Sequence, residues 1–354
     1  MNKLPRESER LLKIVESFPR VTVTVLGDMV ADEFVVGEIS RVSREAPVLI
    51  LRHRERSVVP GGGANAVNNL ADLGVNVLPV GIVGNDEPGR LLLRSFRHKR
   101  IPVTGILRDK NYATVTKTRI LAGMPHTWQQ QVVRLDREPD APLSEHAVRE
   151  LTLASREYLR ASDALLASDY GYGAAAPEIV TAASNAAANR SSRGSRSGGD
   201  QVPLVLDSRH RMLQYSGVTA ATPNEGEVEE ALGIQIGQDW KKLCAAGAEI
   251  SSRMKLHSLI ITRGRDGMVA FSSKHKPVDI PISGSDQIAD VTGAGDTVIA
   301  TFTAALAASA TTEEAAHLAN YAGGIVVMKR GTATVSQQEL VDAIHKAPPQ
   351  TREH

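Results

Sequence analysis

The sequence Asp290-Val-Thr-Gly-Ala-Gly-Asp296 decides the fold, because it joins an extended segment ending near Ile288 to an Ala/Thr-rich helical run over 297–309. Its glycines let the backbone approach a ligand closely, since no side chain blocks the way. The following helix contributes free N–H groups and a positive dipole end, so the stretch predicts an anion-binding cradle. Asp296 places a carboxylate where an anion should sit. It is either an ordinary N-cap, or a base that removes a hydroxyl proton while the cradle holds a phosphoryl group.

Length and composition limit the classes of protein that the chain can belong to. Its 354 residues suffice for one large α/β domain or two ordinary ones. The 41 basic and 40 acidic residues leave a net charge of +1, which disfavours a nucleic-acid binder and a polybasic membrane anchor. A single cysteine, Cys244, cannot form an internal disulfide and fits a reducing compartment. No signal-peptide core or run of 18 apolar residues is present, so we expect a cytoplasmic protein without membrane partners.

Strand and helix patterns alternate along most of the chain. The β-branched run 21–26 is typical of a buried strand, and polar residues follow it at Asp28 and Asp32. Such alternation predicts an α/β fold with a doubly wound, mostly parallel sheet, whose strand ends line a ligand crevice. Further strands are expected at 75–83, 103–107, 164–168, 202–206, 218–223, 259–264, 267–271 and 276–282. Helices are expected at 6–18, 64–73, 88–99, 143–161, 177–188, up to 232, and at 239–254, 297–309, 313–329 and 336–346.

Two segments interrupt this alternation. Residues 33–59 contain two short strands without a crossover helix, and residues 112–136 read as a half-exposed hairpin. We expect them to form a small β-lid on a single domain that spans residues 1–354, with 189–200 as a flexible surface loop. The basic lid residues either form a charged outer face or contact an anionic substrate beneath the lid. These residues are Arg41, Arg44, Lys117, Arg119 and Arg134.

Three more motifs precede the opening heptad. They are Pro60-Gly-Gly-Gly-Ala-Asn65 before a helix, then Asn224-Glu-Gly-Glu227, then Thr262-Arg-Gly264. With the heptad, and in this order, they make residues 20–346 resemble the ribokinase-like (PfkB) family of carbohydrate kinases. The resemblance implies a ribokinase-like fold and ATP-dependent, Mg²⁺-assisted phosphoryl transfer to a sugar hydroxyl.

The resemblance also implies roles for the matching residues. The catalytic set is Asp296 as general base, with the N–H groups of Gly293, Ala294 and Gly295 as the anion hole. The nucleotide set is Asn224, Glu227 (on Mg²⁺ through water), Thr262, Gly264 and Asn320. The sugar set is Asp28, Asp32, Gly62, Gly63 and Asn65, to which the basic lid adds Lys117 and Arg134. A monovalent cation such as K⁺ would lie beside Asp290 and Thr292.

Four stretches bear on the identity of the sugar. Residues 36–48, 116–121, 131–136 and 331–336 look closest to the family's kinases that phosphorylate D-glycero-D-manno-heptose 7-phosphate at O1, towards ADP-heptose and lipopolysaccharide. Those kinases are often fused to a nucleotidyltransferase domain. The chain has no His-x-Gly-His motif, so we expect a stand-alone kinase. The segment Asp207-Ser-Arg-His departs from relatives that often carry lysine at the position of Arg209.

Other interpretations remain open at this point. The chain resembles PfkB kinases for other sugars, such as fructose 1-phosphate or ribose, and it could be a non-catalytic sugar- or nucleotide-binding regulator on the same fold. A dinucleotide-dependent dehydrogenase is disfavoured, because residues 26–32 lack the spaced glycines of that fingerprint. Lids of this family often pair between subunits, so we expect a homodimer with the apolar strand 47–51 at its interface.

Overall fold

The computed structural model describes residues 5–123, 129–191, 202–273, 275–284 and 289–353. At its centre lies a nine-stranded sheet in the order β13-β12-β11-β10-β9-β8-β1-β4-β5. The strands from β5 to β11 are parallel, whereas β12 and β13 each run antiparallel to the preceding strand. The strands are β1 Thr22–Gly27, β4 Asn76–Gly84, β5 Ile106–Asp109, β8 Ala164–Asp169, β9 Leu204–Ser208, β10 Ala220–Ala221, β11 Ser258–Thr262, β12 Met268–Ser272 and β13 His275–Ile280.

The chain leaves the middle of this sheet in both directions, through β4 and β5 on one side of β1 and through β8 to β13 on the other. In open α/β sheets, such a reversal opens a crevice at the carboxyl ends of the strands. The doubly wound, mostly parallel sheet expected from the sequence is therefore present. Expected strand 103–107 is displaced: β5 begins at Ile106, after Gly105, whose Cβ, if present, would lie 2.5 Å from the carbonyl oxygen of Pro79.

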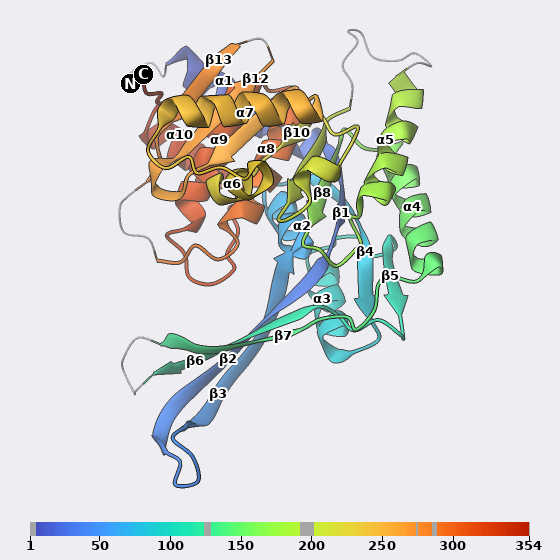
Figure 1. Cartoon of the computed structure of the whole chain (residues 1–354), viewed down its shortest axis with the longest axis vertical. Coiled ribbons are helices and arrows are strands. Elements are labelled where there is room, and N and C mark those ends of the chain that lie inside the picture. Colours follow the sequence, from blue (N-terminus) through green and yellow to red (C-terminus); the bar gives the residue numbers. More distant parts are fainter. Residues whose placement is uncertain (1–4, 124–128, 192–201, 274, 285–288, 354) are drawn as a thin grey trace.

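Helices cover both faces of the sheet (Figure 1). In β8, Ala164 and Leu166 join one apolar cluster, and Leu165 and Ala167 join the other. Burial of both faces explains why these strands read as continuous apolar runs. One face carries α1 Arg6–Ser17, α2 Gly63–Asp72, α3 Glu87–His98, α8 Ala294–Ala307, α9 Thr312–Val326 and α10 Gln337–Lys346. The other carries α4 Glu145–Leu159, α5 Pro177–Ser191, α6 Glu225–Leu232 and α7 Trp240–Met254.

A second, four-stranded sheet projects from the α/β body (Figure 1). Its order is β3-β2-β6-β7, and β2 and β6 are parallel, so the two segments that interrupt the alternation join in one sheet. The first segment is longer than expected, because both of its strands extend back to the body of the protein. The strands are β2 Met29–Val42, β3 Leu49–Gly62, β6 Thr116–Gly123 and β7 Gln130–Arg137.

The Gly-rich segment at 60–65 joins the end of β3 directly to α2. Gly61 and Gly62 end β3 and pair with Val30 and Met29, and α2 begins directly at Gly63. A Cβ on Gly61 would lie 2.5 Å from an oxygen of Asp32, and Gly62 has a φ of +54°. These glycines are therefore required by close packing against β2 and by the backbone conformation that starts the helix.

The remaining expectations fall close to the described elements. Helix α8 begins at Ala294, three residues before the expected start. The segment before the heptad has no strand at 281–284, and 285–288 lie outside the described residues. Most of the expected loop 189–200 also lies outside them, while 189–191 end α5. None of the helices in the described part of the chain has the length and apolar character needed to span a membrane.

Candidate active site

A cavity of about 340 Å³ lies at the carboxyl ends of β8 to β11, between the start of α8 and the roots of β2 and β6. It contains most of the residues singled out from the sequence, together with several that were not. The lining residues are Asp32, Gly62, Lys117, Arg119, Tyr170, Asp207, Arg209, Thr222, Asn224, Glu227, Thr262, Val291, Thr292, Gly293, Gly295, Asp296 and Val298.

Asp296 is the third residue of α8 and is 4% exposed. The N-cap of this helix is Gly293, in the left-handed conformation, so the interpretation of Asp296 as an N-cap is excluded. The Asp296 carboxylate instead accepts two side-chain hydrogen bonds. Tyr170 Oη donates to Oδ1 at 2.6 Å, and Asn65 Nδ2 donates to Oδ2 at 2.9 Å. This buried carboxylate faces the cavity directly.

The environment of Asp296 makes it a usable base. Burial raises the pKa of its carboxyl from 3.8 to about 6, although the hydrogen bonds from Tyr170 and Asn65 oppose the rise. The negative charge of Asp32 also raises this pKa, and Arg209 lowers it. A carboxylate with a pKa near 6 is ionised at neutral pH, yet binds a proton more readily than an exposed aspartate does.

The anion cradle beside Asp296 is smaller than the heptad predicts. Gly293 and Gly295 line the cavity, but Ala294 does not. The N–H of Ala294 donates to the carbonyl oxygen of Val291 at 3.2 Å, so this donor already has a partner. Asp290 holds the loop together rather than facing the cavity. Its two carboxylate oxygens accept from the N–H groups of Thr292 at 2.9 Å and of Gly331 at 3.0 Å.

Basic side chains from the four-stranded sheet enter the cavity from the opposite side. Arg119 Nη1 lies 2.6 Å from Asp32 Oδ1, and Thr332 Oγ1 donates to Asp32 Oδ2 at 3.3 Å. Lys117 is 6% exposed, and its Nζ lies 4.9 Å from the centroid of the Tyr170 ring. Burial first, and then the charge of Arg209, lower the pKa of Lys117.

Tyr170 lines the cavity and contacts both the candidate base and basic side chains. The guanidinium of Arg209 lies 4.4 Å from the centroid of its ring, on which Lys117 also packs. Such cation–π contacts stabilise both cations near the ring. Because the hydroxyl of Tyr170 also reaches Asp296, this residue links the candidate base to two of the positive charges that line the cavity.

Asn224 and Glu227 form the N-terminal capping box of α6. Asn224 Oδ1 accepts from the N–H of Glu227, and Glu227 Oε2 accepts from the N–H of Asn224, both at 2.9 Å. Asp207, near the end of β9, lines the cavity with them. Burial, and then the charges of Glu227 and Asp296, raise the pKa of Asp207 well above its usual value.

Burial raises the pKa of Glu227, and the charge of Glu227 helps to raise that of Asp207, so a cation beside these two carboxylates would stabilise their ionised forms. Asp207 and Glu227 thus fit a Mg²⁺ ion that is held mainly by nucleotide phosphates and water. The described residues contain no cluster of three or more acidic, histidine or cysteine side chains able to hold a metal ion unaided.

Several residues predicted to bind ligand lie outside the cavity. Asp28 is fully buried, and its carboxylate accepts from the N–H groups of Tyr170, Tyr172 and Ala174 at 2.8–3.0 Å. It therefore fixes the loop that carries Tyr170, and a sugar cannot reach it. The others include Gly63 at the start of α2, Asn65, which donates to Asp296, and Gly264 in a short turn. Asn320, which donates to Pro281 O at 2.8 Å, and Arg134, which pairs with Asp136, also lie outside it.

The sequence reasoning missed Tyr170, Thr222 and the inward position of Asp207. Tyr170 directly follows β8, Asp207 is the second-last residue of β9, and Thr222 directly follows β10. The rule that polar residues at carboxyl ends of parallel strands meet in the crevice applies to all three and could have identified them.

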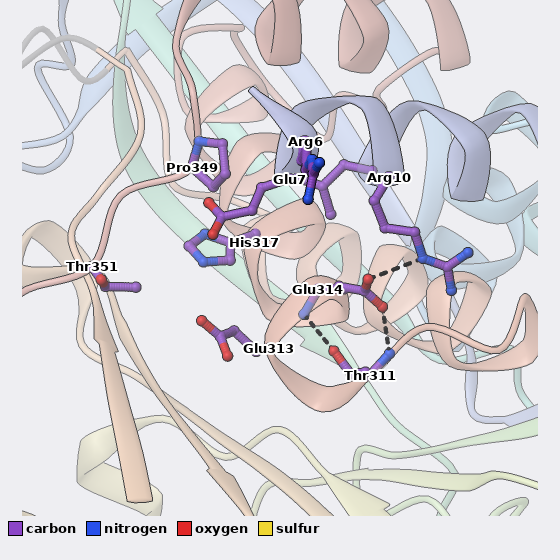
Figure 2. A pocket seen from close by; sticks show the side chains of 10 residues that line it. Arg6, Glu7, Arg10, Thr311, Glu313, Glu314, His317, Pro349 and Thr351 are labelled. Atoms are coloured by element: carbon purple, nitrogen blue, oxygen red, sulfur yellow. Dashed lines mark hydrogen bonds and ion pairs between the residues drawn. The ribbon is translucent and has the colours of Figure 1, made fainter. Parts of the chain in front are cut away.

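A second cavity, of about 390 Å³, lies on another part of the protein, between α1, the start of α9 and the C-terminal segment (Figure 2). Its charged side chains are partly paired, since Arg10 lies 3.0 Å from Glu314, which also caps α9 with Thr311. His317 lies beside them, and burial lowers its pKa to about 4. None of the residues predicted from the sequence to bind ligand lines this cavity.

Comparison with known proteins places this geometry in context. The profile of the pfkB family of carbohydrate kinases matches residues 23–339. The bifunctional protein HldE of Pelobacter propionicus is 37% identical over 321 residues, which cover 90% of the chain and 62% of that protein. HldE of Gluconobacter oxydans is 35% identical over 340 residues, which cover 96% of the chain and 67% of that protein. The chain thus spans about two thirds of the length of these bifunctional relatives.

Solved structures share the fold at low sequence identity. Phosphofructokinase-2 from Escherichia coli, in complex with substrates and products, has a TM-score of 0.72 and 18% identity, over 92% of this chain and 99% of that one. Arabidopsis thaliana ribokinase, complexed with ribose and ATP, has a TM-score of 0.69 and 18% identity, over 92% of this chain and 98% of that one.

Proposed function

Because the chain has a ribokinase-like fold and belongs to the pfkB family of carbohydrate kinases, we propose that it phosphorylates D-glycero-D-manno-heptose 7-phosphate at O1. It is an ATP-dependent sugar kinase; the choice of sugar, the acceptor hydroxyl and the residue roles are proposals. The observation that carries them is Asp296, a buried carboxylate at the start of α8 that faces a cavity lined by Lys117, Arg119 and Arg209.

In this mechanism, Asp296 accepts the proton of the sugar O1 hydroxyl as that oxygen attacks the γ-phosphorus of ATP. The O1–P bond forms while the bond to the ADP oxygen breaks, and ADP leaves with that electron pair. The N–H groups of Gly293 and Gly295 face the developing charge on the transferred phosphoryl group. Asp32 positions the sugar through its hydroxyl groups, since Arg119 and Thr332 fix the orientation of its carboxylate.

The nucleotide is assigned to the other end of the cavity, beside Asn224, Glu227 and Thr262. A Mg²⁺ ion there, held by the phosphates and through water by Glu227, would neutralise charge on the phosphoryl groups. A K⁺ ion beside Asp290 and Thr292 remains part of the proposal, because the structural relative phosphofructokinase-2 from E. coli has been solved in complex with potassium. We place the reaction in the cytoplasm, which supplies ATP.

The positive charge at the proposed sugar site favours heptose 7-phosphate over an unphosphorylated sugar as the substrate. Lys117 is almost fully buried, and its Nζ lies over the rings of Tyr170 and Tyr172. The charge of Asp32 acts on it, but no ion pair of Lys117 is found among the described residues. A substrate phosphate would supply the missing counter-charge. Thr332, which lies in the heptose-kinase-like stretch 331–336, donates to Asp32 in the same cavity.

The four-stranded sheet is assigned as a lid that closes over the sugar and joins two subunits. Its tip and outer strands expose apolar side chains that a monomer would leave in water. These side chains are Val42, Val48, Leu49, Val132, Val133 and Leu135, between 42% and 64% exposed. The apolar strand 47–51 expected at a dimer interface contains two of them, so we propose a homodimer formed through the lid.

Asp296→Asn tests the assignment of the base. General bases typically contribute about 10²–10⁴-fold to turnover, so we expect kcat to fall by that factor while calorimetry shows unchanged sugar affinity. Asp239→Asn, the same change at the N-cap of α7 and outside the cavity, should retain far more turnover. Near-normal kcat in Asp296→Asn would refute the assignment, and loss of sugar binding would indicate a role in binding instead.

A further inference from the structure

Behind Asp296 runs a chain of buried polar side chains that the proposed reaction does not use. Thr297 Oγ1 donates to Asn69 Oδ1 at 2.9 Å, and Asn69 Nδ2 donates to Asn65 Oδ1 at 3.1 Å. Asn65 Nδ2 then donates to Asp296 Oδ2 at 2.9 Å. Thr297, Asn69 and Asn65 are each 0% exposed, so no water competes with these contacts.

The direction of every bond in this chain follows from one charge. An ionised carboxylate can only accept, so Asn65 must present its amide nitrogen to Asp296. Its oxygen then faces away and needs a donor, which Asn69 supplies. The oxygen of Asn69 in turn needs a donor, which is the hydroxyl of Thr297. Reversal of any amide would place two acceptors or two donors in contact, in a site where burial makes such a mismatch costly.

We propose that Asn69 and Thr297 are positioning residues, which hold the amide of Asn65 with its nitrogen towards Asp296 and thereby keep the base ionised. The inference rests on the proposed role of Asp296 as the base. It also revises the role predicted for Asn65, whose amide nitrogen is committed to the base rather than to the sugar.

The geometry of the two helices supports this role. Asn69 lies one turn after Asn65 in α2, and its Nδ2 also donates to the carbonyl oxygen of Asn65 at 3.0 Å. Thr297 lies next to Asp296 in α8, and its hydroxyl also contacts the Gly293 carbonyl oxygen at 3.3 Å. Three contacts thus fix the side chain of Asn69 and two fix that of Thr297, so the amide of Asn69 cannot rotate without losing its hydrogen bonds.

Other groups also affect the pKa of Asp296, but their contributions are separate from that of Asn69 and Thr297. Tyr170 donates to its second oxygen, and Asp32 on β2, Asp207 in β9 and Arg209 after β9 interact with it through their charges. All of these lie on the cavity side, whereas Asn69 and Thr297 lie behind Asn65. Of the forces on the pKa of Asp296, the hydrogen bond from Asn65 is one of the two that most strongly oppose burial.

The test is the pH dependence of kcat at saturating sugar and ATP. Asn69→Leu keeps the approximate volume but leaves Asn65 Oδ1 without its donor, so the amide can turn its oxygen towards Asp296. We expect the midpoint of the acidic limb of the kcat–pH profile to move up by about one pH unit. The free energy of one hydrogen bond to a charged group corresponds to a pKa shift of about that size. Turnover would then fall about eightfold at pH 5.5 and very little at pH 8. The KM for the sugar should stay unchanged.

Three variants control this measurement. Thr297→Val should shift the limb in the same direction by a smaller amount, and Thr297→Ser, which retains the hydroxyl, should restore it. Asn68→Leu makes the same chemical change at the preceding, half-buried position of α2 and should leave the profile unaltered. If Asn69→Leu does not fold, Thr297→Val and Thr297→Ser carry the test alone.

The outcomes distinguish this inference from the proposed function. A limb that stays in place, with kcat lowered equally at pH 5.5 and pH 8, would show that Asn69 and Thr297 are only structural and would overturn the inference. The assignment of Asp296 as the base would still hold in that case, provided that Asp296→Asn abolished turnover. If Asp296→Asn kept its turnover, the limb would belong to another group and the proposed function itself would fail.

Discussion

Replacing Asp296 by asparagine should stabilise the folded protein at alkaline pH while it removes activity. The carboxyl of Asp296 has a pKa near 3.8 when unfolded and about 6 when folded, chiefly because it is buried. The folded state therefore binds the proton more tightly. The resulting contribution to stability is fully present below pH 3.8 and is lost as the pH rises through 6.

The size of the effect follows from the difference between the two pKa values. At about 1.36 kcal/mol per unit, the ionised carboxylate lowers the free energy of unfolding by about 3 kcal/mol above pH 6. Asparagine removes that charge but offers only one acceptor to the two donors, Tyr170 Oη and Asn65 Nδ2. One mismatched donor costs about 1–2 kcal/mol. We therefore expect a net gain of about 1–2 kcal/mol at pH 8 and no gain at pH 4.

Urea denaturation of both proteins at pH 8 and pH 4 measures this difference. Asp290→Asn is the matched control, because two backbone N–H groups that contact Asp290 help to lower its pKa. Stability from a lowered pKa is present at neutral pH and lost on acidification, so this variant should be destabilised at pH 8. An Asp296→Asn protein that is no more stable than the wild type at pH 8 would refute the description of Asp296 as a buried, ionised carboxylate.

Three further substitutions test other parts of the site. Lys117→Met should raise the KM for the sugar phosphate about 10–100-fold, because one charged hydrogen bond is lost. Equal rises of the KM values for the sugar phosphate and for ATP would contradict a phosphate contact at Lys117. Gly61→Ala places a Cβ 2.5 Å from Asp32 Oδ2, so thermal unfolding should show that the free energy of unfolding falls by about 1–3 kcal/mol. Sugar binding should weaken as well, and an unchanged sugar affinity would show that Asp32 does not contact the sugar. Leu135→Lys, at a side chain 64% exposed, should convert a lid-paired dimer into a monomer, and sedimentation that finds the wild type monomeric at micromolar concentration would refute the pairing.

The main sheet could be predicted from sequence because each of its central strands is buried on both faces. Runs such as Val21–Leu26 and Ala164–Ser168 are apolar for that reason, and Gly or Asp marks their carboxyl ends. The four-stranded sheet was harder to delimit. Strand β3 contains charged residues throughout Arg52–Arg56 and ends in glycines, so neither a period of two nor an apolar run reveals its full length.

The site could be predicted wherever a local pattern carries the chemistry. The heptad and the capping residues Asn224 and Glu227 are recognisable because glycines and helix caps occupy fixed positions in sequence. Tyr170 carries no such pattern, since it is a single aromatic residue after a strand. Arg119 was assigned to the lid, but its ion pair with Asp32 depends on the parallel pairing of β2 with β6, which sequence does not encode locally.

The most direct test of the proposed function compares kcat/KM for D-glycero-D-manno-heptose 7-phosphate with that for the unphosphorylated heptose, with ribose and fructose 1-phosphate in the same ADP-release assay. Because no carboxylate among the described residues forms an ion pair with the buried Lys117, we expect the heptose 7-phosphate to be preferred by about 100-fold over the unphosphorylated heptose, or about 3 kcal/mol of transition-state binding. Higher kcat/KM for an unphosphorylated sugar would contradict the proposal, and a different phosphorylated sugar at the top of the series would replace heptose as the substrate.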